Sequence, residues 1–193
     1  MTATAIRNVA LQYLAAYDYD AFSMNQIANE VGIKKASIYA HYRSKEEIFY
    51  AVLTEALHDG KQKIVRFFLE QRDQPLDETL HAFFRWFVKE SEDHLQLKFL
   101  LRMLYFPPSH LKSYESSQYT GALLVSFEKL LARYIREKKR TDHFRLLQSE
   151  ADVSIAFLTV VEGCFIELFF GDVRRFERRV QAILPLFLNG MRK

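Results

Sequence analysis

The sequence has one cysteine, six glycines and four prolines among 193 residues. The single thiol, Cys164, excludes an internal disulfide framework and a zinc site built from several cysteines, and it favours a reducing, cytoplasmic compartment. Few glycines and prolines, together with the lack of a long alternating β-branched run, favour helices over strands. We therefore expect an all-α fold.

Long apolar segments are also scarce. Residues 1–17 have polar residues between the apolar ones and lack the pattern of a signal peptide. The most apolar stretch, residues 153–170, contains Glu162 and Glu167, so a buried helix explains it better than a bilayer span. We expect no membrane contact.

Motifs of common enzyme chemistries are missing as well. The sequence has no glycine-rich phosphate loop, no HExxH and no nucleophile elbow, and its six histidines are too scattered for a local metal motif. We therefore expect no catalytic residues, no cofactor and no metal.

Aromatic residues, by contrast, are plentiful, since seventeen Phe and ten Tyr help to bring the aromatic share to 15%. Such a surplus suits cavities or interfaces lined by rings, and it suits a helical core filled with Phe equally well. The spacing of apolar residues predicts about nine helices, approximately over residues 3–17, 24–31, 35–42, 45–68, 76–91, 95–105, 116–137, 150–170 and 173–191.

Positive charge is concentrated near the N-terminus, although the net charge of the chain is only +3. Residues 1–33 hold one cation and three acids, whereas residues 34–45 hold four cations and no acid: Lys34, Lys35, Arg43 and Lys45. A local footprint of this kind is what phosphate binding needs.

The same region has the pattern of a helix-turn-helix. Ser23 and Gln26 have capping-box spacing, and Gly32 is placed to end the first short helix. In the second helix, turning Ile38 and Tyr42 inward leaves small and basic side chains on the opposite face, where they suit DNA bases and phosphates. An ordinary helical hairpin with solvated lysines is the alternative.

Residues 22–49, "FSMNQIANEVGIKKASIYAHYRSKEEIF", resemble the signature of the tetracycline-repressor (TetR) family. The resemblance covers about forty residues, from Ile6 through Phe49, and beyond them the chain matches only in length and helical pattern. It implies a three-helix DNA-binding domain over residues 1–46, followed by a ligand-binding and dimerisation domain over residues 47–193.

By this resemblance, the second short helix begins with the base-reading positions, Lys35, Ala36 and Ser37. The full set of implied DNA contacts is Ser23, Gln26, Lys34, Lys35, Ala36, Ser37, Tyr39, His41 and Lys45. The chain departs from the family pattern at Asp18, where a left-handed glycine is usual, at Lys34, which replaces a capping serine, and at Ala40, which replaces an aromatic residue. These departures leave the operator sequence undetermined.

Helical-wheel positions in the larger domain suggest an inward-facing set that lines a cavity for a small apolar or aromatic effector. This set comprises Phe83, Trp86, Phe87, Leu100, Met103, Phe127, Tyr134, Glu162 and Phe165. A solid core is the alternative for each apolar member. Glu162 is a candidate partner for a cationic or hydrogen-bonding ligand, and a salt bridge across a dimer or an exposed rim position explains it as well.

The predicted helix over residues 150–170 is apolar on nearly every side, so it needs cover on two faces. A stripe on the last helix suits a second subunit, and the resemblance also implies a homodimer through the last two helices. The dimerisation residues that we expect are Phe157, Phe176, Val180, Ile183, Leu184 and Phe187. The cations of residues 133–140 are expected to form a solvated helix end.

Together these features favour a homodimeric transcription regulator, with repression as the preferred mode. It is expected to bind double-stranded, palindromic operator DNA and to leave it when a small-molecule effector binds. Two other classes stay open: a helical carrier whose N-terminal module binds a protein, and an all-α enzyme that uses Glu162 or a histidine.

Overall fold

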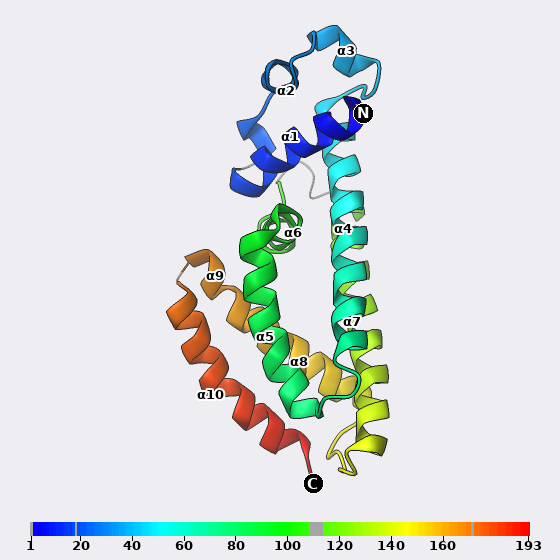
Figure 1. Cartoon of the computed structure of the whole chain (residues 1–193), viewed down its shortest axis with the longest axis vertical. Helices are drawn as coiled ribbons and strands as arrows, with labels where there is room; N and C mark the ends of the chain where they lie inside the picture. The colour runs from blue at the N-terminus through cyan, green and yellow to red at the C-terminus, as the bar shows by residue number, and fades with distance from the viewer. Residues whose placement is uncertain (1, 18, 109–113, 171) are drawn as a thin grey trace. The chain divides into compact units, whose positions relative to one another are not determined.

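Helices account for the regular structure of the chain in the computed structural model, which describes residues 2–17, 19–108, 114–170 and 172–193, without the side chains of residues 114–120, 169 and 170. The helices are α1 Thr2–Ala16, η1 Tyr19–Ala21, α2 Met24–Val31, α3 Lys35–Tyr39, α4 Lys45–Glu70, α5 Leu76–Asp93, α6 Leu95–Tyr105, α7 Tyr114–Thr141, α8 Glu150–Phe165, α9 Glu167–Phe170 and α10 Val173–Met191 (Figure 1). The prediction of an all-α fold is confirmed.

Most helix boundaries follow the sequence pattern. The helices α6 and α10 begin and end at the predicted residues, and α10 continues through Pro185. The helix α3 ends at Tyr39 instead of Tyr42, because the N–H groups of His41 and Tyr42 both donate to the carbonyl of Ile38 and tighten the last turn. The predicted helix over residues 150–170 is divided at Ile166 into α8 and α9.

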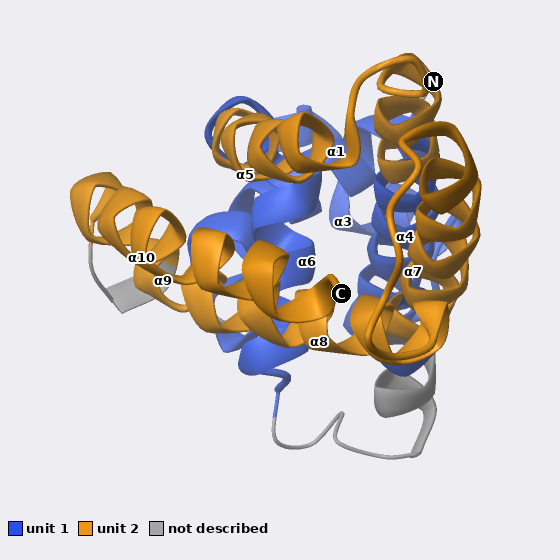
Figure 2. Cartoon of the chain, turned by 90° about the horizontal axis from the view of Figure 1, so that it is seen from below, with its two compact units in different colours: residues 1–62, 90–123 blue, residues 63–89, 124–193 orange. Residues whose placement is uncertain are grey.

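The helices form two units, which Figure 2 shows in different colours. Unit 1 comprises residues 1–62 and 90–123, and unit 2 comprises residues 63–89 and 124–193. Each of α4, α5 and α7 begins in one unit and ends in the other. None of the helices in the described part of the chain is long and apolar enough to cross a membrane.

The core of unit 1 joins α1, α2, α3, α6 and the first part of α4. Tyr19, Phe22, Phe49 and Phe99 form a chain of edge-to-face ring contacts, with centroids 5.4–6.0 Å apart. The helix α4 approaches α6 closely at Gly60, where a Cβ atom would lie 2.9 Å from the side chain of Leu100. Asp18, where the sequence suggests a left-handed residue, lies outside the described residues.

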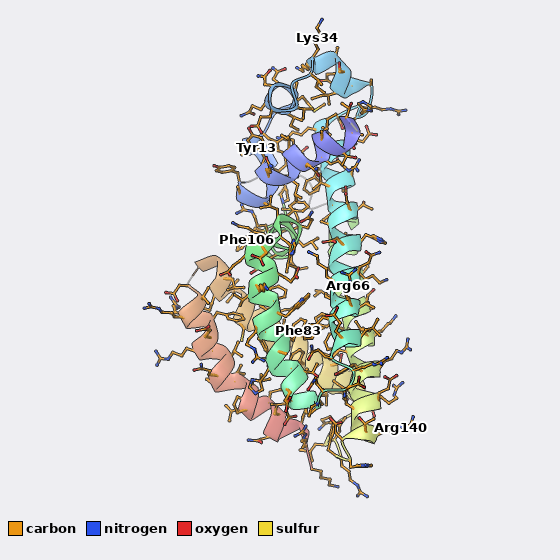
Figure 3. All side chains as sticks on the ribbon, viewed as in Figure 1. Tyr13, Lys34, Arg66, Phe83, Phe106 and Arg140 are labelled. Carbon is orange, nitrogen blue, oxygen red and sulfur yellow. The ribbon has the colours of Figure 1, made fainter. Side chains whose placement is uncertain are left out.

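The core of unit 2 is a network of aromatic rings around Phe83 of α5, which is labelled in Figure 3. We call this network the aromatic cluster; its members are Phe67, Phe68, Phe83, Phe84, Trp86, Phe87, Phe127, Tyr134, Phe157, Phe165, Phe176 and Phe187. Within it, Phe87 and Phe165 are stacked, with centroids 3.4 Å apart. Part of the aromatic surplus of the sequence is thus used for helix packing in unit 2.

Candidate nucleic-acid interface

The first helix of the motif, α2, is fixed at both ends by local hydrogen bonds. The Ser23 hydroxyl accepts from the N–H of Gln26 at 3.3 Å, and the side-chain oxygen of Gln26 accepts from the N–H of Ser23 at 2.8 Å. At the other end, Gly32 has φ +75°, a left-handed conformation that favours glycine. The predicted capping box and helix stop are therefore confirmed, and they set the turn into α3.

The second helix, α3, presents the small and basic side chains to solvent. Ile38 is fully buried and Tyr42 nearly so, which turns the rest of the helix outward, as the wheel predicts. The exposed residues are Lys34, Lys35, Ala36, Ser37, Tyr39 and His41. Figure 3 shows Lys34 extending away from the backbone beside α3.

The cations of this face lack partners within the part of the chain that the structure describes, where no carboxylate lies within 4.0 Å of Lys34 or Lys35. Lys34 occupies the N-cap position of α3, yet its side chain makes no capping bond. A lysine is poorly placed there for helix stability, because the first N–H groups already carry partial positive charge. The arrangement is suited to an external polyanion.

Lys45, at the start of α4, has a different environment from the one that phosphate binding needs. Its ammonium nitrogen lies over the rings of Tyr19 and Phe22, 4.2 and 4.5 Å from their centroids, and burial lowers the pKa of Lys45. A phosphate contact therefore requires this side chain to leave the two rings. The sequence around Lys45 does not predict this contact with the rings, because Tyr19 and Phe22 lie more than twenty residues before it.

The cap of α4 also differs in detail from the predicted capping box. The Ser44 hydroxyl accepts from the N–H of Glu47 at 3.1 Å, as expected. The carboxylate of Glu47 accepts from the N–H of Arg43 at 2.5 Å, one residue before the predicted donor. The start of α4 is still held by two reciprocal bonds.

A polar contact that the sequence analysis missed fixes the motif to its supporting helices. Arg7 of α1 donates to the hydroxyl of Tyr42 at 2.9 Å and forms an ion pair with Glu55 of α4 at 2.6 Å. Hydrogen bonds to Tyr42 first, and then to Glu55, raise the pKa of Arg7. Arg7 is 35 positions from Tyr42 and 48 positions from Glu55 in the sequence. No rule of local spacing could therefore have found the contact.

The residues predicted to bind an effector belong to both units. Leu100 and Met103 belong to the core of unit 1, whereas the aromatic members lie in the cluster of unit 2. Glu162 is partly exposed in unit 2, where burial and the charge of Glu128 raise its pKa. Two surface grooves lie in unit 2, one of about 280 Å³ between α4 and α7 and one of about 440 Å³ between α5 and α10. Of the predicted residues, Tyr134 lines the first, and none lines the second.

The residues predicted for dimerisation divide into two groups. Phe157, Phe176, Val180 and Leu184 are buried within the chain's own core, whereas Ile183 and Phe187 keep some exposure. The most exposed large apolar residues of α8 and α10 are instead Ile155, 50% exposed, and Leu186, 68% exposed. A second subunit can therefore reach α8 and α10 only through their outer faces.

Glu167, the second acid of the apolar segment, is paired. It is 4% exposed, and its carboxylate forms ion pairs with Arg175 at 3.0 Å and Arg179 at 2.5 Å. Both arginines remain partly exposed, with side-chain exposures of 63% and 51%. Their role within the chain is to neutralise a buried acid.

Comparison with known proteins agrees with the helix-turn-helix geometry of α2 and α3. Residues 6–52 match the model of the family of bacterial regulatory proteins called tetR. The chain thus carries the DNA-binding segment of TetR-family transcriptional regulators. A comparison with curated proteins gave no match.

Solved structures share the TetR-like fold over nearly the whole chain. A TetR-family regulator from Agrobacterium tumefaciens is 18% identical with a TM-score of 0.74, and covers 95% of this chain and 96% of its own. FadR from Bacillus subtilis, solved with stearoyl-CoA, is 14% identical with a TM-score of 0.71, over 97% and 98% of the two chains. SmeT, the repressor of a Stenotrophomonas maltophilia multidrug efflux pump, is 18% identical with a TM-score of 0.71, over 100% and 91%.

Proposed function

We propose that this TetR-family regulator is a homodimeric repressor that binds a palindromic operator through residues 1–46 and is released by a small molecule bound to residues 47–193. The observation that carries the proposal is the exposed face of α3, where Lys34 and Lys35, which have no acid within 4.0 Å among the described residues, precede the small side chains of Ala36 and Ser37. Such a face lets the backbone approach base edges while cations neutralise phosphates.

Within that face, the first turn of α3 is proposed to read bases. Lys35 suits guanine acceptors, Ala36 a thymine methyl group, and Ser37 either donors or acceptors. Residues at the edges of the face are proposed to contact phosphates: Ser23, Gln26, Lys34, Tyr39 and His41, with Lys45 joining them after its side chain leaves the aromatic rings. A two-fold dimer would place two α3 helices about 34–36 Å apart, in successive major grooves.

The dimer is proposed to form through the outer faces of α8 and α10. The exposed side chains of Ile155, Ile183 and Leu186 leave apolar area in water that a second subunit would cover. This assignment keeps the predicted helices and Ile183, and it adds Ile155 and Leu186 in place of the buried members of the predicted set.

The effector is proposed to be a small, largely apolar molecule. SmeT has been solved with triclosan, and FadR with stearoyl-CoA, so chains of this fold accept such molecules. Because α4 begins in unit 1 and ends in unit 2, a change at its C-terminal end can bear on the DNA-binding segment. Coupling of about 1–3 kcal/mol would lower DNA affinity about 5–150-fold.

Selection of bound sequences from a random DNA pool, followed by titration of the selected operator at several salt concentrations, tests the proposal. We expect saturable binding with a steep salt dependence, two half-sites in the selected sequence, and loss of binding in Lys35→Ala and Tyr39→Ala. Arg140→Ala, an exposed change at the C-terminal end of α7, is the matched control. Failure to prefer any sequence over random DNA at moderate salt would reject the repressor and favour the carrier or enzyme alternatives.

A further inference from the structure

The surface groove of unit 2 between the C-terminal halves of α4 and α7, here called the α4–α7 groove, has a partly apolar lining. It has a volume of about 280 Å³, and its apolar lining includes Val65, Phe68, Leu69 and Leu130. Leu69 is 64% exposed, an unfavourable position for a large aliphatic side chain in a free chain. The groove therefore offers apolar area that a ligand of modest size would bury.

The same groove is also lined by cations. Arg72, Arg133 and Lys138 line it, against the single carboxylate of Glu137 among its lining residues. Arg72 has an ion pair with Asp73 in which both side chains are largely exposed, so solvent weakens that pair. The lining of the groove thus combines apolar side chains with an excess of positive charge.

Lys138 is the most unusual of these cations, because it is only 5% exposed. Its ammonium donates to the carbonyl of Arg72 at 2.6 Å and lies 5.6 Å from the centroid of the Tyr134 ring. Within the described residues, no carboxylate lies within 4.0 Å of Lys138, and one acceptor serves an ammonium that has three donors. Capping the end of α4 explains this single bond, but a buried cation without an acid is costly.

The second cation on α7, Arg133, is exposed and has no ion pair among the described residues. It lies five residues before Lys138 in the sequence, and both line the groove. Two cations with unused donors at the edge of an apolar groove match an oxyanion attached to an apolar tail.

We propose that the α4–α7 groove binds an anionic amphiphile, a molecule with a carboxylate or phosphate head on a short apolar tail. The tail lies on Phe68 and Leu69, and the head accepts from Arg133 and Lys138. This proposal deepens the proposed function. It rests on that function only where it takes the anionic amphiphile to be the effector. Binding itself is measured without DNA, so its failure leaves operator recognition untouched.

The test is isothermal titration of the full-length chain with four octyl compounds that share a tail and differ in the head: octanoate, octyl phosphate, 1-octanol and octyltrimethylammonium. We expect saturable binding of octanoate, octyl phosphate or both, at one site per chain. We expect the alcohol to bind at least tenfold more weakly and the cation not to bind saturably. The tighter of the two anions identifies a carboxylate or a phosphate as the natural head.

Substitutions then place the head in the groove. Arg133→Gln and Lys138→Met are each expected to weaken binding of the tighter anion about tenfold, the effect of losing a charge-assisted hydrogen bond of about 1.4 kcal/mol. Arg136→Gln, an exposed change on the same helix outside the groove, is the control and is expected to leave the affinity within about twofold. If Lys138→Met unfolds the chain, Arg133→Gln still decides the question.

Three results would overturn the proposal: equal binding of octanoate and octanol, non-saturable uptake of all four compounds, or an Arg133→Gln affinity equal to that of the Arg136→Gln control. A decrease in operator affinity on addition of the bound anion would then connect the groove to regulation. No such decrease, with anion binding intact, would reject the effector role while leaving the site in place.

Discussion

The recognition segment of unit 1 and the α8–α10 face of unit 2 leave different groups exposed to solvent. The first exposes lysines that have no acid within 4.0 Å among the described residues, whereas in the second Glu167 pairs with two of the arginines of α10, Arg175 and Arg179. In turn, α8 and α10 expose aliphatic side chains such as Ile155 and Leu186. Unpaired charge suits a polyanion and exposed apolar area suits a protein surface, so one chain offers two kinds of interface.

The two regions also differ in what supports them. The recognition segment depends on short-range bonds, such as the reciprocal pair between Ser23 and Gln26. The face of unit 2 lies over the aromatic cluster, whose rings come from segments far apart in the sequence. Substitutions should therefore separate the two: a core change in unit 2 should lower stability, and a surface change on α3 should lower DNA affinity alone.

The largest effect is expected from Phe83→Ala. Phe83 is fully buried and contacts several rings of the aromatic cluster, so its removal leaves a cavity and lowers the free energy of unfolding by about 3–5 kcal/mol. Urea denaturation followed by circular dichroism measures this. Val125→Ala, at a residue that is 45% exposed, is the control. A loss below about 1 kcal/mol for Phe83→Ala would show that the cluster is not the core of unit 2.

A smaller effect, of a different kind, is expected from Lys35→Ala. The side chain is exposed and has no carboxylate partner among the described residues, so the free energy of unfolding should stay within about 0.5 kcal/mol of the original. Operator affinity should fall about tenfold, the equivalent of about 1.4 kcal/mol, because Lys35 is proposed to read a base. Fluorescence anisotropy with labelled operator measures the affinity. A destabilised variant would show that the α3 face is also structural.

Local rules predicted the recognition segment well, for a physical reason. A capping box, a left-handed glycine and an inward-facing pair four residues apart depend on neighbours in the chain, and Ser23, Gly32 and Ile38 all lie as expected. The ends of α6 and α10 follow from equally local signals. The segment that matches the TetR family model, residues 6–52, includes these same positions.

Contacts between distant segments could not be predicted in this way. The cation–ring contact of Lys45 and the bonds of Arg7 depend on how helices pack. A helical wheel finds the apolar stripe of α10 but cannot say whether it faces the chain's own core or a partner. The stripe that includes Phe176 and Leu184 faces the core, and Leu186 lies outside it.

Lys45→Met tests which of two roles this lysine has. Loss of the cation over two rings should cost about 0.5–1 kcal/mol of unfolding free energy, since Lys45 is only partly buried. If Lys45 also contacts a phosphate, the slope of log K against log[salt] should decrease by about 0.9. Thermal melts and salt titrations of operator binding measure the two quantities. An unchanged slope with reduced stability would restrict Lys45 to the internal contact and remove it from the DNA-binding set.

The smallest effect is expected from Glu162→Gln, and it should depend on pH. Burial and the charge of Glu128 raise the pKa of Glu162 above 4.5, so the folded state disfavours the ionised carboxyl group. Its contribution to stability is then most favourable below about pH 4.5 and is lost as the pH rises through the raised pKa. Glu162→Gln stays uncharged, so its free energy of unfolding should match the original chain at low pH and exceed it at pH 7. Urea denaturation at both pH values measures this difference. Glu128→Gln is a companion variant that should lower the pKa of Glu162 back toward its ordinary value. If Glu162→Gln were less stable than the original chain at pH 7, the ionised Glu162 would instead be stabilised by a favourable partner.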